Sequence, residues 1–182
     1  MFNLINSLSI KLVLYPIMKS IKISDLSKSK SKILSEAHEE ALKGSFTGVR
    51  HRMSCVAFKN GTIISKGRNH LRTKLGNNIM PSFHAEVDTI NRIKKKESSR
   101  KIDVLITRID WNGCYANAMP CMHCTSIMLC KGIRRVYYTL SNDLIIVAKV
   151  KDLINNTYLT YSQQNHLQNK RCKLSLTQLI TN

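Results

Sequence analysis

The sequence predicts an α/β protein: a three-layer α/β/α domain built around a single mixed sheet of about five strands. Two observations carry this prediction. An Asn-Gly pair stands between two β-prone runs, and after it two apolar runs with helical periodicity alternate with two short apolar runs that suit buried strands. The chain has 182 residues and a hydrophobic fraction of 43%. This is enough for one domain with a real core, and it excludes a fully disordered chain.

The domain is expected to span residues 31–154. Residues 1–30 are interpreted as an N-terminal extension or linker, because residues 19–30 are rich in Ser and Lys and lack periodicity. A helix over residues 31–43 then opens the domain, with apolar residues at helical spacing up to a glycine that ends it. Residues 155–182 form a polar, weakly patterned tail.

A β-hairpin follows the first helix. The β-prone runs 55–58 and 62–65 flank Asn60-Gly61, and an Asn-Gly pair in this setting is the strongest short hairpin signal. A polar loop over residues 70–82 leads away from the hairpin.

Two helices and two strands complete the middle of the chain. Apolar residues at intervals of three and four predict a helix over residues 83–96, and a second helix is expected over 121–131. Residues 102–109 and 133–139 are the buried strands that follow them. The order from the hairpin onwards is therefore β-β-α-β-α-β.

The apolar run 144–148 has two interpretations. Only residues 141–143 separate it from the preceding strand, and a parallel crossover needs a dozen residues or more. If the run is a strand, it therefore pairs antiparallel with its predecessor. The alternative is a helix over residues 143–154, since short apolar runs do not distinguish the two.

The net charge of +18, from 29 Lys and Arg against 11 Asp and Glu, first suggests a nucleic-acid or anionic surface as partner. However, the excess is +6 in each third of the chain, divided at residues 60 and 120. A dedicated binding tail concentrates its charge, so biased composition is the simpler explanation. Local clusters that could line an anionic substrate path are Arg68 with Arg72 and Lys74, and Arg92 with Lys94, Lys95 and Lys96.

No stretch of eighteen consecutive apolar residues exists, so we expect no membrane span. The segment before Met18, itself an alternative start, lacks the basic n-region of a secretory signal. The six cysteines therefore have no secretory context that would favour disulfides. A cytoplasmic, intracellular protein is expected.

Four residues on the two central helices carry the chemistry. His84 supplies an imidazole, and Cys121 and Cys124 share one face at the start of the next helix, where the positive helix end favours thiolates. These are good zinc ligands, and three ligands leave a position for water, as in catalytic zinc sites. Glu86 lies two residues from His84 and can approach the same metal as a general acid and base.

This set suits hydrolytic deamination. Zinc lowers the pKa of its water and supplies hydroxide at neutral pH. Attack of that hydroxide on an amidine-like ring carbon, with a carboxylate passing the proton to the departing amine, removes an amino group.

His84-Ala85-Glu86 followed by Pro120-Cys121-x-x-Cys124 resembles the zinc-dependent cytidine/deoxycytidylate deaminase superfamily. The resemblance covers roughly residues 55–148. It implies the cytidine deaminase fold, a Zn²⁺ cofactor held by the His and the two Cys, Glu86 as proton shuttle, and a homo-oligomer.

The resemblance also suggests substrate residues. Family members place an Asn that contacts the substrate after the second strand, often as Gly-x-Asn, and Gly67-Arg68-Asn69 matches. Asn69 is therefore a candidate substrate residue. Arg68 beside it, with Arg72 and Lys74, is a candidate phosphate contact, which would favour a nucleotide over a nucleoside.

Two departures from the family patterns concern the subfamily. Residues 110–119 intervene before the Pro-Cys motif, where tRNA adenosine deaminases have a short segment. The short 141–143 connection favours the last-strand direction of free-nucleoside cytidine deaminases, whereas Pro-Cys-Met-His-Cys is closer to the deoxycytidylate type.

The expected function is zinc-dependent deamination of a cytosine nucleoside or nucleotide of the cytidine, CMP or dCMP class. The alternatives are deamination of adenosine or cytidine within RNA or DNA, and a non-catalytic zinc-binding interaction module. A thiol redox pair and a structural zinc site are further alternatives, the latter requiring a fourth ligand such as His123 or Cys130.

Overall fold

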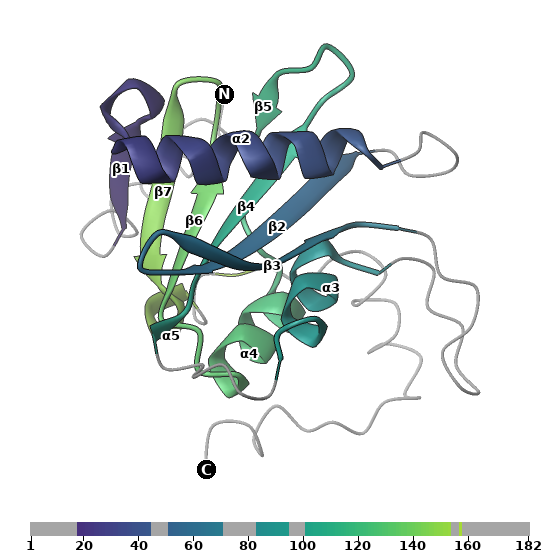
Figure 1. Cartoon of the computed structure of the whole chain (residues 1–182), viewed down its shortest axis with the longest axis vertical. Helices are drawn as coiled ribbons and strands as arrows, with labels where there is room; N and C mark the ends of the chain where they lie inside the picture. The colour runs from purple at the N-terminus through teal and green to yellow at the C-terminus, as the bar shows by residue number, and fades with distance from the viewer. Residues whose placement is uncertain (1–17, 45–50, 71–82, 95–100, 154–156, 158–182) are drawn as a thin grey trace, which may run out of the picture.

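The computed structural model describes residues 18–44, 51–70, 83–94, 101–153 and 157. Its elements form a seven-stranded sheet in the order β1-β7-β6-β4-β2-β3, with the short β5 pairing with β4 (Figure 1). In chain order the elements are β1 (Lys19–Lys22), the 3-10 turn η1 (Ile23–Asp25), α2 (Lys28–Leu42), β2 (Arg52–Lys59), β3 (Thr62–Arg68), α3 (Ala85–Asn91), β4 (Asp103–Ile109), β5 (Tyr115–Ala116), α4 (Met122–Cys130), β6 (Arg135–Thr139), β7 (Leu144–Lys149) and α5 (Val150–Leu153).

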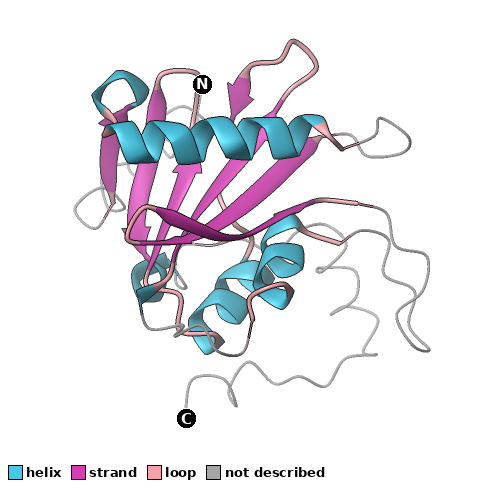
Figure 2. Cartoon of the chain, viewed as in Figure 1, coloured by secondary structure: helices cyan, strands magenta, loops and turns pink. Residues whose placement is uncertain are grey.

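The helices cover both faces of the sheet, which confirms the predicted three-layer α/β/α architecture. Helix α2 lies across one face, and α3, α4 and α5 lie on the other (Figures 1 and 2). Under α2, Ile33, Leu34 and Ala37 pack on Leu105 and Tyr137 of the sheet. The opposite face holds the larger apolar cluster, which includes Ala85, Ile90, Ile106, Met128 and Leu153. The sheet is therefore buried on both sides, as its apolar strands require.

The predicted hairpin is present and longer than expected. Strands β2 and β3 pair antiparallel and flank Asn60-Gly61. Both turn residues have positive φ, 52° for Asn60 and 82° for Gly61, as a two-residue type I′ turn needs. The Asn-Gly pair thus sets the register of the first two strands.

The last strand runs in the predicted direction. Strand β7 pairs antiparallel with β6, and β6 pairs parallel with β4. The alternative of a helix over residues 143–154 is wrong, because Leu144–Lys149 is hydrogen-bonded to strands on both sides and helix forms only in α5.

Residues 19–30 differ from the predicted linker. Lys19–Lys22 form the edge strand β1, paired antiparallel with β7, and α2 already begins at Lys28. An edge strand of mainly Lys and Ser has no apolar alternation, so its sequence looks like a solvated linker. Strands β1 and β5 account for a sheet of seven strands in place of about five.

Helix α3 is also shorter than the predicted 83–96. Phe83 forms a β-bridge with His70, and the helix ends at Asn91. Several expectations lie outside the described residues: the segment before Met18, the contacts of Arg72, Lys74, Lys95 and Lys96, and the tail over residues 155–182 apart from Thr157. The division into extension, domain and tail stays a prediction. Within the described ranges, no helix is long and apolar enough to cross a membrane.

Replacing Gly61 with Ala should lower the free energy of unfolding by about 1–2 kcal/mol, because an L side chain is strained at this φ of 82°. Gly61→Asn should cost less, since Asn tolerates the left-handed region. Urea denaturation of the three proteins checks this, and equal stability of all three would contradict a type I′ turn here.

Candidate metal centre

Two helix starts meet on one face of the sheet and carry the predicted metal ligands. His84 is the N-cap residue of α3, and Cys121 is the N-cap residue of α4. Both have the extended backbone typical of this position, with ψ of 146° and 166°. Cys124 lies in the first turn of α4. The structure thus brings together side chains that are 37 and 40 residues apart.

The three donor atoms have a spacing that suits a tetrahedral metal. The His84 Nδ1 lies 3.2 Å from the Cys124 Sγ and 3.6 Å from the Cys121 Sγ. All three donors lie within 4.8 Å of one another. Tetrahedral bonds of about 2.3 Å to sulfur and about 2.0 Å to nitrogen place such atoms about 3.5 Å apart. One imidazole and two thiols also form a donor set typical of zinc, so the residues fit this ion.

The two cysteines differ in their electrostatics. A hydrogen bond from the Cys124 thiol, with a further contribution from His84, lowers the pKa of Cys121 to about 3. The same hydrogen bond, together with burial and the nearby Glu86, raises the pKa of Cys124 well above its usual value. The helix end was expected to favour thiolates at both positions. The two pKa shifts have opposite directions because one hydrogen bond joins the two sulfurs.

Glu86 lies beside the cluster and is almost completely buried, with 2% of its surface exposed. Burial raises the pKa of its carboxyl group, against the opposing effect of the His84 charge. Its Oε2 atom has no hydrogen-bond partner among the described residues. Burying a carboxyl oxygen without a hydrogen-bond partner costs free energy. This oxygen is therefore a candidate for hydrogen bonding to a bound ligand or substrate.

No fourth protein ligand joins the cluster in the described part of the chain, where the group consists of His84, Cys121 and Cys124. His123 is exposed. Cys130 is also exposed, at the end of α4. These two candidates for closing a structural site therefore lie apart from it.

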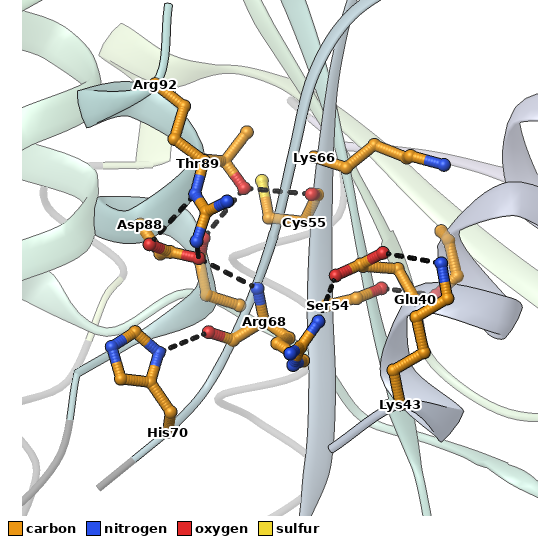
Figure 3. A network of polar contacts seen from close by, with 12 residues as sticks. Glu40, Lys43, Ser54, Cys55, Lys66, Arg68, His70, Asp88, Thr89 and Arg92 are labelled. Carbon is orange, nitrogen blue, oxygen red and sulfur yellow. Dashed lines mark hydrogen bonds and ion pairs between the residues drawn. The ribbon is translucent and has the colours of Figure 1, made fainter. Parts of the chain in front are cut away.

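The two candidate substrate residues, Asn69 and Arg68, have different hydrogen-bond partners in the fold. The Asn69 amide donates to the His51 carbonyl at 2.7 Å and accepts from the Met53 N–H at 2.9 Å, which holds the end of β3 to the start of β2. The Arg68 guanidinium lies 2.8 Å from the carboxylate of Glu40 on α2 (Figure 3). Helix α2 covers the face of the sheet opposite α3 and α4. The structure therefore does not bring Arg68 to the metal cluster.

Gly67 lets α3 approach the hairpin closely, a role that the sequence analysis missed. A Cβ atom there would lie 2.6 Å from the Thr89 backbone N and 2.8 Å from the Asp88 Oδ2. The Thr89 hydroxyl donates to the Cys55 carbonyl at 2.8 Å, and the Arg68 N–H donates to Asp88 (Figure 3). The only sequence signal was a glycine inside a β-prone run, which often marks a close backbone approach. These contacts fix the helix that begins at His84.

Replacing Gly67 with Ala should lower the free energy of unfolding by about 1–3 kcal/mol, as overpacking does, and should reduce zinc content because α3 must shift. Urea denaturation and metal analysis of the purified protein measure the two effects. Thr62→Ala, at the exposed start of the same strand, is the matched control and should change neither. Full zinc content in both variants would contradict the docking role of Gly67.

Comparison with known proteins shows a family match that reaches well beyond the metal-binding motifs. The family model described as the cytidine and deoxycytidylate deaminase zinc-binding region matches residues 27–140, well over half of the sequence. No curated protein sequence matched this chain.

Solved structures match across most of the chain. Cytidine deaminase from Burkholderia pseudomallei has a TM-score of 0.53 and 12% identity, over 73% of this chain and 100% of that one. Cytidine deaminase from Mycobacterium leprae has a TM-score of 0.50 and 16% identity, over 70% and 98%. The dCMP deaminase of cyanophage S-TIM5, in complex with dCMP and dUMP, has a TM-score of 0.47 and 19% identity, over 62% and 82%.

The first two likenesses show that the fold is that of cytidine deaminases. The family match includes the hairpin, the His84 motif and the Cys121 motif within one continuous segment. The chain therefore belongs to the cytidine and deoxycytidylate deaminase zinc-binding family, and zinc is its cofactor.

Proposed function

We propose that this protein hydrolytically deaminates a cytosine nucleoside or nucleotide, with His84, Cys121 and Cys124 as zinc ligands and Glu86 as the proton carrier. The observation that carries the proposal is the buried Glu86 carboxyl group, whose Oε2 has no partner among the described residues. Within the same part of the chain, the neighbouring metal-binding group has three donors. A site built to hold a structural ion needs four protein donors and no such carboxylate.

Zinc, when bound, supplies Lewis acidity and brings the pKa of water from about 16 to about 7. The protein's own residues then position and move protons. The overall reaction forms a bond between water oxygen and the ring carbon and breaks the bond from that carbon to the exocyclic nitrogen. One proton of the water must reach the departing amine, which leaves as ammonia. We assign to Glu86 the role of accepting and returning that proton, because its buried carboxyl group interacts with His84 and the two cysteines and its Oε2 has no partner among the described residues.

Asn69 remains our candidate for orienting the substrate. Its two side-chain hydrogen bonds use one amide N–H and one carbonyl lone pair. An amide has a second N–H and a second lone pair, so Asn69 retains both a donor and an acceptor. Its backbone position, fixed by the N–H bond to the Met53 carbonyl at 3.1 Å, makes these groups rigid. The Glu40 ion pair of Arg68 does not favour the phosphate contact that the sequence suggested for that arginine.

The proposal predicts ammonia release when zinc-loaded protein is incubated with cytidine, deoxycytidine, CMP or dCMP. Glu86→Gln should retain zinc and lose at least about a hundredfold of the rate, since general acid–base catalysis contributes about 10²–10⁴. A coupled ammonia assay with metal analysis of both proteins measures this.

The same assay separates the alternatives. Turnover only of cytidine or adenosine within an oligonucleotide would favour the nucleic-acid deaminase. Zinc retention with no turnover of any substrate would favour the non-catalytic module. Unchanged turnover in Glu86→Gln would remove Glu86 from the proposed mechanism.

Zinc content should depend on three side chains and on no other cysteine of α4. Cys124→Ser should lower the zinc-to-protein ratio well below one, because serine is a poor ligand for this ion. Cys130→Ser is a matched control, since it changes an exposed cysteine of the same helix and should leave the ratio unchanged. Elemental analysis after dialysis gives the ratio, and zinc loss in the Cys130 variant would mean that a fourth ligand had been missed.

A further inference from the structure

Thr139, the last residue of β6, lies where two strands share one edge of β4. Strand β2 occupies the other edge along the whole of β4. On the shared edge, β6 pairs with β4 as far as Ile106, and β5 pairs with it from Arg108 onwards. Thr139 is completely buried at this junction. A polar side chain in such a position must find its hydrogen-bond partners inside the protein.

Two polar groups of Thr139 hold the segment that leads from β5 to α4. Its hydroxyl donates to the Ala116 carbonyl at 2.8 Å and accepts from the Arg108 N–H at 3.4 Å. Its carbonyl accepts from the Ala118 N–H at 2.8 Å. Ala116 and Ala118 are thus both bonded to one residue, as in a parallel strand pair, except that a hydroxyl replaces the backbone N–H donor.

The path from this anchor to the metal ligand Cys121 is short and stiff. Only Met119 and Pro120 separate it from Ala118. The ring of a proline locks its own φ, and the residue before a proline is restricted to extended backbone. The Asn117 side chain also accepts from the Met119 N–H, at 3.0 Å. The position of Ala118 therefore determines the position of the Cys121 backbone, with little freedom between them.

Cys121 depends on this segment more than Cys124 does. Cys124 lies in the first turn of α4, and that helix is held in the apolar core by Met128. Cys121 is the N-cap residue and has extended backbone, so only half of its surroundings belong to the helix. The other half is the segment that Thr139 holds.

We propose that Thr139 is a positioning residue for the metal centre, whose hydroxyl and carbonyl hold residues 116–118 so that the Cys121 thiol lies beside the other two donors. The inference concerns zinc binding and does not depend on which compound is deaminated, or on deamination itself. Removing groups that orient metal ligands commonly lowers metal affinity by about 10–100-fold. Thr139 acts one step further out, through the backbone that carries the ligand.

Thr139→Val removes the hydroxyl and keeps nearly the same side-chain shape. The buried Ala116 carbonyl then loses its donor, so we expect the segment to shift. Zinc affinity, measured by competition with a chromophoric chelator, should fall at least about tenfold. In the cobalt-substituted protein, the d–d and thiolate-to-cobalt absorption bands should change, because they report the geometry at the ion. Thr139→Ser restores the hydroxyl and should return the affinity to within about threefold of wild type.

Thr107→Val is the matched control. Thr107 is equally buried, on the neighbouring strand β4, but its hydroxyl lies 2.8 Å from the Ser54 hydroxyl and 3.5 Å from the Ala37 carbonyl of α2. Metal binding is coupled to folding, so a general loss of stability also lowers zinc affinity. Urea denaturation therefore accompanies each titration. Thr107→Val should lower the free energy of unfolding without changing the cobalt spectrum.

Equal effects of the two valine variants on zinc affinity and on the cobalt spectrum would overturn the proposal in favour of a general packing role. Unchanged affinity and spectrum in Thr139→Val would also overturn it, as would failure of Thr139→Ser to restore the lost affinity. If Thr139→Val does not fold, Asn117→Ala tests the same segment from an exposed position, where substitutions rarely unfold a protein. It removes the bond to the Met119 N–H and should change the cobalt spectrum, and an unchanged spectrum would overturn the proposal.

Discussion

The close contact between α3 and the β2–β3 hairpin is the constraint on which the site depends. His84 caps α3 and Glu86 lies in its first turn, so the position of this short helix decides where both side chains lie. The contact requires Gly67, because a Cβ atom at that position would meet Thr89 and Asp88 at under 3 Å. Tight packing tolerates little displacement, and a shift of the helix by a fraction of an ångström would change the geometry of the metal donors.

The second helix of the site is fixed by the sheet itself. Strands β4 and β6 are parallel, and α4 is the crossover helix between them, which places its N-terminus near the carboxyl end of β4. The N–H of Ala118 donates to the Thr139 carbonyl of β6 at 2.8 Å, and this bond holds the segment that leads to Cys121. Two helix starts from different parts of the fold thereby converge, and only their meeting creates a metal-binding group.

The sequence predicted the features that depend on local backbone preferences and on periodicity. Asn60-Gly61 needs positive φ at both positions, and His84, Glu86, Cys121 and Cys124 lie at helix starts that periodicity reveals. Features that depend on tertiary contacts were missed: the edge strand β1 has no apolar pattern, and Arg68 gives no sign of which face it occupies. A one-residue difference in position along a strand exchanges the faces, so Arg68 meets Glu40 while Gly67 meets α3.

The net charge of +18 is informative only once the partners of individual cations are known. Lys66, Arg68, Arg92 and Arg134 neutralise carboxylates within the fold and offer little to a ligand. Arg108 is different because its position on the metal-bearing face gives it histidine and carbonyl neighbours and no carboxylate within the described ranges. The total charge therefore identifies no ligand by itself, because it does not distinguish the cations that already neutralise carboxylates of the fold from those that do not.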